Sequence, residues 1–162
     1  PAFQVRFNYQ NANSDKWYSV DNVEVIVDIY NSCSTTSGPV PAPDGSGGTS
    51  PLHGDRVTSS GDSIDVTWDA SSCTASGDNL LYGALADVSF HGLSGSVCSI
   101  GTGGSYGWSG VPAGDLFFLV VGTDGGVIES SWGADGDGIE RYGMSASGEC
   151  SVTEKLITAN CP

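Results

Sequence analysis

The fold of this chain is decided by the stretch "SIDVTWDAS" at residues 63–71 and by the segments that follow it. Ile64, Val66 and Trp68 alternate with polar residues, and a period of two is expected of a β-strand that buries one face. Short strands separated by turns rich in Gly, Asp and Ser predict an all-β fold, a Greek-key β-sandwich. The further strand segments lie within residues 79–90, 105–111, 116–123 and 127–133.

The composition agrees with one all-β domain. The 162 residues include 24 Gly and one Met, and few runs of the Ala, Leu, Lys and Glu that sustain helices. A chain of this length buries one sizeable core but hardly two. We therefore expect a single sandwich with appendages.

The formal net charge is −14, from 19 acidic and 5 basic residues. A surface of this sign repels phosphate backbones and anionic lipid head groups, which argues against nucleic acid and membrane partners. The acidic balance suits high salt or divalent cations, and it equally keeps an abundant exported protein soluble. No apolar run reaches the roughly 20 residues of a membrane helix, so we expect no membrane insertion.

The chain has five cysteines, none in CxxC spacing, and only two His. This usage argues against zinc and for disulfides formed in an oxidising compartment, so we expect secretion. Local context suggests two pairs, Cys73 with Cys98 on either side of one strand region and Cys150 with Cys161 around a short terminal loop. Cys33 is left over, as an intermolecular partner or a free thiol. Sequence alone leaves other connectivities open.

The first 31 residues contain two strand patterns, one in "FQVRFNY" at residues 3–9 and one within residues 16–30. Each alternates apolar and polar residues, as a half-buried strand does. A two-stranded ribbon is marginal in water by itself, so these strands are expected to pack on something else. The apolar positions on which such packing depends are Phe3, Val5, Phe7, Val23, Val25 and Val27.

This N-terminal segment resembles the closing strands of jelly-roll modules of the MAM and CUB-like kind. The resemblance rests on "VRFNYQNANSDKWYSVDNVEV" at residues 5–25, and the rest of such a module is absent. Residues 32–50 are a linker by composition, because Gly, Ser, Thr and Pro bury too little surface to offset the entropy of ordering.

Residues 51–142 resemble a fibronectin type III-like domain, an immunoglobulin-like β-sandwich. The resemblance rests on "IDVTWD", with Trp68 as the buried tryptophan of the B strand, and on "VPAGDLFFLVVGTDGG", which is similar to the run into strand F. The family usually has a tyrosine where Phe117 stands, so the tyrosine-corner hydrogen bond is absent or the register is shifted by one.

The chain looks closest to a bacterial variant of this domain that is appended to secreted proteins. In that variant two cysteines, here Cys73 and Cys98, sit after the Trp strand and before strand E. The last segment, residues 143–162, is then a C-terminal extension closed by the second disulfide.

Two histidines, His53 and His91, are the candidates for a general base. Neither lies in a nucleophile elbow, and we expect both to be loop or strand-edge residues. Paired carboxylates for glycoside hydrolysis are hard to exclude in so acidic a chain, but small sandwiches usually lack the cleft. We predict that the protein is not an enzyme.

The best candidate for a metal site is the turn "GADGDGIER" at residues 133–141, where Asp135, Asp137 and Glu140 offer the hard oxygen ligands that calcium prefers. The spacing departs from that of an EF-hand loop. The alternative is a solvated turn in which Asp bonds its own backbone. We expect no cofactor other than calcium.

The tryptophans could also form a platform on which sugar rings stack, if two of them lie exposed and coplanar. Trp68 is expected in the core because of its alternation, which leaves Trp17, Trp108 and Trp132 as candidates. The alternative is that these three cover the sandwich and its N-terminal strands.

Three functions follow from these patterns. The first is a structural or adhesive subunit that self-associates into a filament or oligomer, because a sheet edge accepts a strand and the linker can carry residues 1–31 to the next copy. The second is a glycan-binding or spacer accessory domain of a secreted hydrolase. An enzyme comes third.

Overall fold

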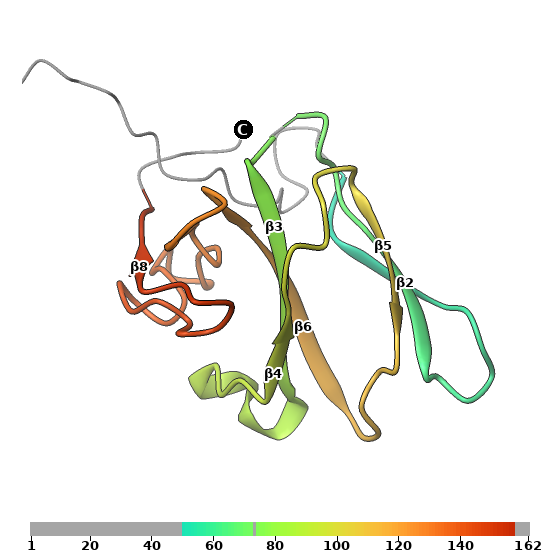
Figure 1. Ribbon diagram of the computed structural model, residues 1–162. Helices are drawn as coiled ribbons and strands as arrows, with labels where there is room; N and C mark the ends of the chain where they lie inside the picture. The colour runs from blue at the N-terminus through green and yellow to red at the C-terminus, as the bar shows by residue number, and fades with distance from the viewer. Residues whose placement is uncertain (1–49, 73, 158–162) are drawn as a thin grey trace, which may run out of the picture. The chain divides into compact units, whose positions relative to one another are not determined.

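The computed structural model describes residues 50–72 and 74–157, and within them the chain forms two β-sheets (Figure 1). The first sheet is antiparallel, with the strand order β1-β2-β5. Its strands are β1 (His53–Arg56), β2 (Ser63–Thr67) and β5 (Ser105–Ser109).

The second sheet has five strands in the order β4-β3-β6-β7-β8. Its pairs are antiparallel except β7 with β8, which run parallel. The strands are β3 (Gly77–Ala84), β4 (Gly95–Val97), β6 (Leu116–Thr123), β7 (Ile128–Glu129) and β8 (Glu154–Lys155), and a 3₁₀ helix, η2 (Leu85–Phe90), follows β3. The prediction of an all-β fold is confirmed, while the predicted N-terminal strands and most of the linker lie outside the described residues.

The predicted inward face of β2 is confirmed. Val66 and Trp68 are buried in the core between the two sheets, and Ile64 packs against them. The same core receives Leu80 from β3 and Trp108 from β5. Alternation on a half-buried strand therefore located the centre of the sandwich correctly.

β6 is buried on both of its faces. Phe118 and Val120 pack in the core between the sheets, while Leu119 and Val121 pack on the opposite face. An unbroken apolar run, rather than an alternating one, is what a strand covered on both sides requires.

The predicted strand over residues 79–90 is shorter in the structure. β3 ends at Ala84, and the next six residues form η2 instead. His91 ends η2 in the left-handed conformation, with φ 55°, and its backbone N–H donates back to the helix. The local turn therefore replaces the strand that was predicted to continue through Leu85 and Val88.

Residues after β7 cover the outer face of the five-stranded sheet. In Figure 1 this segment, coloured orange to red, lies on the far side of β3 and β6 from β2 and β5. Trp132 is buried there against Leu81 and Val121. The five-stranded sheet therefore has the three-stranded sheet on one face and C-terminal chain on the other.

Candidate functional site

β6 has an open edge along most of its length. It pairs with β3 over all eight residues, but with β7 only at Thr123 and Glu129. The ladder stops because Ser130 turns its hydroxyl, not its carbonyl, to the Gly122 N–H at 3.0 Å. Trp132 then lies on the outer face of the sheet. Among the described residues, no strand pairs with Leu116–Val121 on this side.

The backbone groups that face the open edge can be identified. Gly122 accepts a backbone hydrogen bond from Ser130 at 2.9 Å, so its peptide groups point towards β7. Alternate residues of an antiparallel strand direct their N–H and C=O to the same side. Leu116, Phe118 and Val120 therefore direct theirs to the same open edge.

A groove with both polar and apolar lining residues lies between the sheets beside this edge. Its volume is about 490 Å³, and Trp108, Leu116 and Phe118 line it together with Gly54 and Arg56 of β1. A Cβ on Gly54 would lie 2.8 Å from the Phe118 ring, so the glycine lets this ring pack against the β1 backbone. The groove thus joins an edge strand of one sheet to the open edge of the other.

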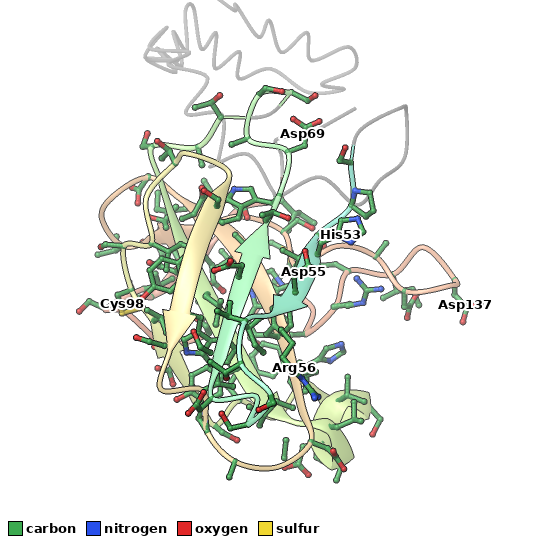
Figure 2. The ribbon with its side chains drawn as sticks, turned by 90° about the vertical axis from the view of Figure 1, so that its right-hand side faces the viewer. His53, Asp55, Arg56, Asp69, Cys98 and Asp137 are labelled. Atoms are coloured by element: carbon green, nitrogen blue, oxygen red, sulfur yellow. A yellow bond between two sulfur atoms is a disulfide. The ribbon has the colours of Figure 1, made fainter. Side chains whose placement is uncertain are left out.

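The rim of the groove carries both charges. Arg56, on β1, is exposed and makes no ion pair within the part of the chain that the structure describes (Figure 2). Asp62 faces the same cavity, and hydrogen bonds from Thr58 and Ser60 lower the pKa of its carboxyl group. Asp62 therefore stays ionised at neutral pH.

A second region of interest is a buried ion pair under the C-terminal segment. The Lys155 side chain is fully buried, and its Nζ lies 2.7 Å from Oε1 of Glu140. The ammonium also donates to the carbonyls of Arg141 and Gly143, at 2.7 and 3.0 Å. It sits 4.8 Å from the centre of the Trp132 ring, close enough for a cation–π contact. The charge is fully satisfied inside the protein.

Glu129 is a second buried carboxyl-bearing side chain of this region. Its Oε1 accepts hydrogen bonds from the Trp132 indole at 3.0 Å and from the Ser147 backbone N–H at 2.7 Å. Its Oε2 accepts the Ser147 hydroxyl at 2.6 Å. These bonds tie the chain after β7 to the segment before β8. We call residues 129–155 the C-terminal clasp.

The predicted calcium ligands are divided between two environments. Asp135 accepts the backbone N–H groups of Asp137 and Ile139, each at 2.9 Å, as in a solvated Asx turn. Glu140 points instead to Lys155. No group of three or more His, Cys, Asp or Glu side chains suited to a metal ion occurs among the described residues. Calcium binding at this turn stays a prediction.

The candidate sugar-stacking tryptophans are core residues where the structure describes them. Trp108 is 3 % exposed and packs against Tyr82 and Phe118. Trp132 is 6 % exposed and packs from the clasp onto Leu81 and Val121. Both therefore agree with the alternative interpretation, in which the rings cover the sandwich, because each ring packs on an apolar face of the five-stranded sheet. Trp17 lies outside the described residues.

The disulfide pairing differs from the expected one. Cys98 is bonded to Cys150, 52 residues away, with the Cα atoms 5.5 Å apart. The bond joins the segment after β4 to the clasp, which corrects the expected pairs Cys73–Cys98 and Cys150–Cys161. The expected pairs joined cysteines that are close in sequence, and they are wrong because segments far apart in sequence meet on the outer face of the sheet. Cys33, Cys73 and Cys161 lie outside the described residues.

A polar cavity of about 350 Å³ lies beside this disulfide. It is lined by Asp78 and Asn79 of β3 among other polar residues. Burial raises the pKa of Asp78 to about 6, although a hydrogen bond from Trp68 opposes the shift. Asp78 is only 4 % exposed, so its charged form loses most of its hydration.

The two histidines occupy different surroundings. His53 is exposed on β1, at an edge of the three-stranded sheet (Figure 2). His91 follows η2 and lies edge-on to Trp132 and Tyr142, with ring centres 6.3 and 6.4 Å away. The prediction of loop or strand-edge positions is confirmed for both, because His53 lies on an edge strand and His91 in the turn after η2.

Sequence reasoning missed the open edge of β6 and the buried charges of the clasp. Glu129 and Lys155 stand in short segments that read as ordinary turn and strand ends. Their sequence pattern gave no sign of burial, because each stands next to an apolar residue and successive side chains of a strand point to opposite faces. What covers them is not visible from the sequence.

Comparison with protein-family models, with curated proteins and with solved structures finds no match for the chain. Within the described residues, no helix has the length and apolar character needed to cross a lipid bilayer.

Proposed function

We propose that this protein is a non-enzymatic, extracellular structural or adhesive protein, and that it forms filaments by strand exchange of its N-terminal segment. The observation that carries the proposal is the open edge of β6 beside the groove that Leu116 and Phe118 line. Unpaired N–H and C=O groups at a sheet edge accept an added strand. A face that lacks a neighbouring strand gives such an addition both backbone partners and apolar surface to bury.

The disulfide supports an extracellular location. Disulfides persist in oxidising compartments and are rare in the cytosol. Cys98–Cys150 joins the clasp to the sheet, and a reducing compartment would not maintain this bond. The net charge of −14 favours solubility after export.

The strand order supports a Greek-key, fibronectin type III-like fold. Lettered in chain order as A, B, C, C′, E, F and G, strands β1 to β7 form the sheets A-B-E and C′-C-F-G. Trp68 is buried beside the strand that corresponds to B. The short β7 is the departure, because strand G of such a domain would run along more of strand F.

Particle size tests the proposed function. Light scattering and negative-stain microscopy of the full chain are expected to show filaments or large oligomers, and these should disappear when residues 1–31 are deleted. Near-UV circular dichroism of the shortened chain controls for folding. A monodisperse monomer at every concentration of the full chain would refute assembly.

An accessory glycan-binding domain is the second candidate. Tyr142 is 43 % exposed and stacks on Trp132 with the ring planes 5° apart and the centres 5.0 Å apart. A tyrosine ring held flat from behind offers its other face to a sugar. A glycan panel with the wild type and Tyr142→Ala tests this candidate, which requires binding that the substitution removes.

A further inference from the structure

We propose that the open edge of β6 is an acceptor slot for residues 3–9 of a second copy of this chain. In this arrangement the donor segment adds a strand beside Leu116–Val121 and places its apolar side chains in the groove. The inference rests on the proposed function and names its acceptor and donor.

The slot and the donor agree in length and pattern. The open part of β6 has six residues, Leu116–Val121, and "FQVRFNY" has seven. Strands rise about 3.3 Å per residue, so the donor spans the whole slot and exceeds it by one residue. Phe3, Val5 and Phe7 share one face of the donor, which suits a strand with one side in a groove.

The groove favours a donor with aromatic side chains. Its walls include the partly buried Phe118 ring, and its volume of about 490 Å³ leaves room for more than one large side chain. Aromatic pairs in edge or offset contact stabilise beyond the area they bury. The competing segment around Val25 offers valines on its apolar face, which would fill the groove less well.

The backbone partners of the donor are defined by the register of β6. The peptide groups of Leu116, Phe118 and Val120 point to the open edge, while those of Leu119 and Val121 point to β3. A donor strand would satisfy the first set and leave the second unchanged. The proposal therefore predicts that a donor strand protects the amides of alternate residues along β6.

A second copy is favoured as the source of the donor. Residues 32–50, a linker by composition, separate the donor from the groove, and at roughly 3 Å per residue an extended linker of that length can reach a neighbouring copy. When each copy donates residues 3–9 and accepts a donor at β6, the contact between copies is head-to-tail. A contact of this kind repeats without closing and yields a filament.

Hydrogen exchange resolved to single amides, measured on the full chain, tests the proposal. In assembled wild-type protein, the Phe118 and Val120 amides are expected to be protected as strongly as those of Leu119 and Val121. Phe7→Asp should disperse the assemblies and speed exchange at Phe118 and Val120 about tenfold or more. Protection at Leu119 and Val121 should stay, which shows that the variant is folded.

Two full-chain variants serve as matched controls. Gln4→Asp adds the same charge on the polar face of the donor, and it should leave assembly and amide protection intact. Val25→Asp places the charge in the competing segment and should also leave the Phe118 and Val120 amides protected. If Val25→Asp acts and Phe7→Asp does not, the assignment of the donor is overturned.

The remaining outcomes separate this inference from the proposed function. Assemblies that survive Phe7→Asp with unchanged exchange would mean that the copies join elsewhere, which overturns the slot and leaves assembly standing. A monomer whose Phe118 and Val120 amides lose protection in Phe7→Asp would mean that the chain donates to itself, which overturns the second copy. A monomer with both amides unprotected would overturn the slot and the proposed function together.

Discussion

The two faces of the five-stranded sheet are held by different kinds of interaction. The inner face packs on the three-stranded sheet through apolar side chains such as Val66, Leu80 and Val120. The outer face is covered by the clasp, which combines a small apolar cluster around Trp132 with buried charges and a disulfide. One sheet therefore shows what non-directional burial and directional bonding each contribute.

The difference matters because the two kinds of contact fail differently. An apolar core loses stability roughly in proportion to the volume removed and can partly relax. A buried charge that loses its partner keeps the full cost of its lost hydration. The clasp should therefore be more sensitive to single polar substitutions than any part of the inner core is, and four predictions test this comparison.

The largest effect is expected from Lys155→Met. The substitution leaves Glu140 without its cation and the carbonyls of Arg141 and Gly143 without a donor. We expect a loss of about 3–5 kcal/mol in the free energy of unfolding, measured by urea denaturation. Adding Glu140→Gln should recover part of the loss, because the orphaned charge is gone. A loss no larger than that of an exposed pair would contradict the buried network.

Removal of the Cys98–Cys150 bond tests how firmly the clasp is attached. The double substitution Cys98→Ser and Cys150→Ser releases a constraint that spans 52 residues. The expected cost is about 2–4 kcal/mol in urea denaturation. Reductant should lower the stability of the wild type to that of the variant and leave the variant unchanged. Equal stability with and without the bond would show that the hydrogen bonds alone hold the clasp.

Asp78→Asn is expected to stabilise the protein at neutral pH. The folded-state pKa of Asp78, about 6, lies above the ordinary value of 3.8, so the folded state binds the proton more tightly than the unfolded state does. The wild type therefore loses stability as pH rises from about 4 to 6, by about 1–3 kcal/mol, and the loss persists at pH 7. Urea denaturation at several pH values should show this decline in the wild type relative to the Asn variant. Parallel pH profiles would contradict a buried carboxyl group.

The smallest effect concerns the exposed face of the three-stranded sheet. Asp55 and Asp65 stand directly opposite each other on β1 and β2, and like charges in that position repel. Asp65→Asn should stabilise the protein by about 0.2–1 kcal/mol at low salt, as measured by thermal unfolding. The gain should fade at high salt. Asp137→Asn, in an exposed turn, is the matched control and should give a smaller gain.

The sequence predicted the core strands because their signal is local. The alternation of Ile64, Val66 and Trp68 predicts a buried strand face from a few neighbouring residues, and the structure confirms that prediction. The apolar run at residues 116–123 predicted a strand, but it did not predict that both faces of this strand are covered. Periodicity indicates which residues are buried and leaves open what lies against them.

The candidate site was harder to predict for the same reason. The open edge of β6 exists because Ser130 diverts the chain after a single paired residue, and a turn of that kind has no distinct sequence pattern. The Asp135 turn was anticipated as one of two alternatives, whereas the role of Glu140 depends on Lys155, fifteen positions further along the chain. Contacts between separate segments depend on how those segments pack.

The sequence by itself determined that the protein is acidic, all-β and organised around a strand with a buried tryptophan, because charge, propensity and period are properties of neighbouring residues. Only the tertiary structure decided that Cys98 joins Cys150, that Lys155 meets Glu140, and which strand edge stays open. These outcomes depend on directional contacts between distant segments, and such contacts are defined only once the sheets have packed.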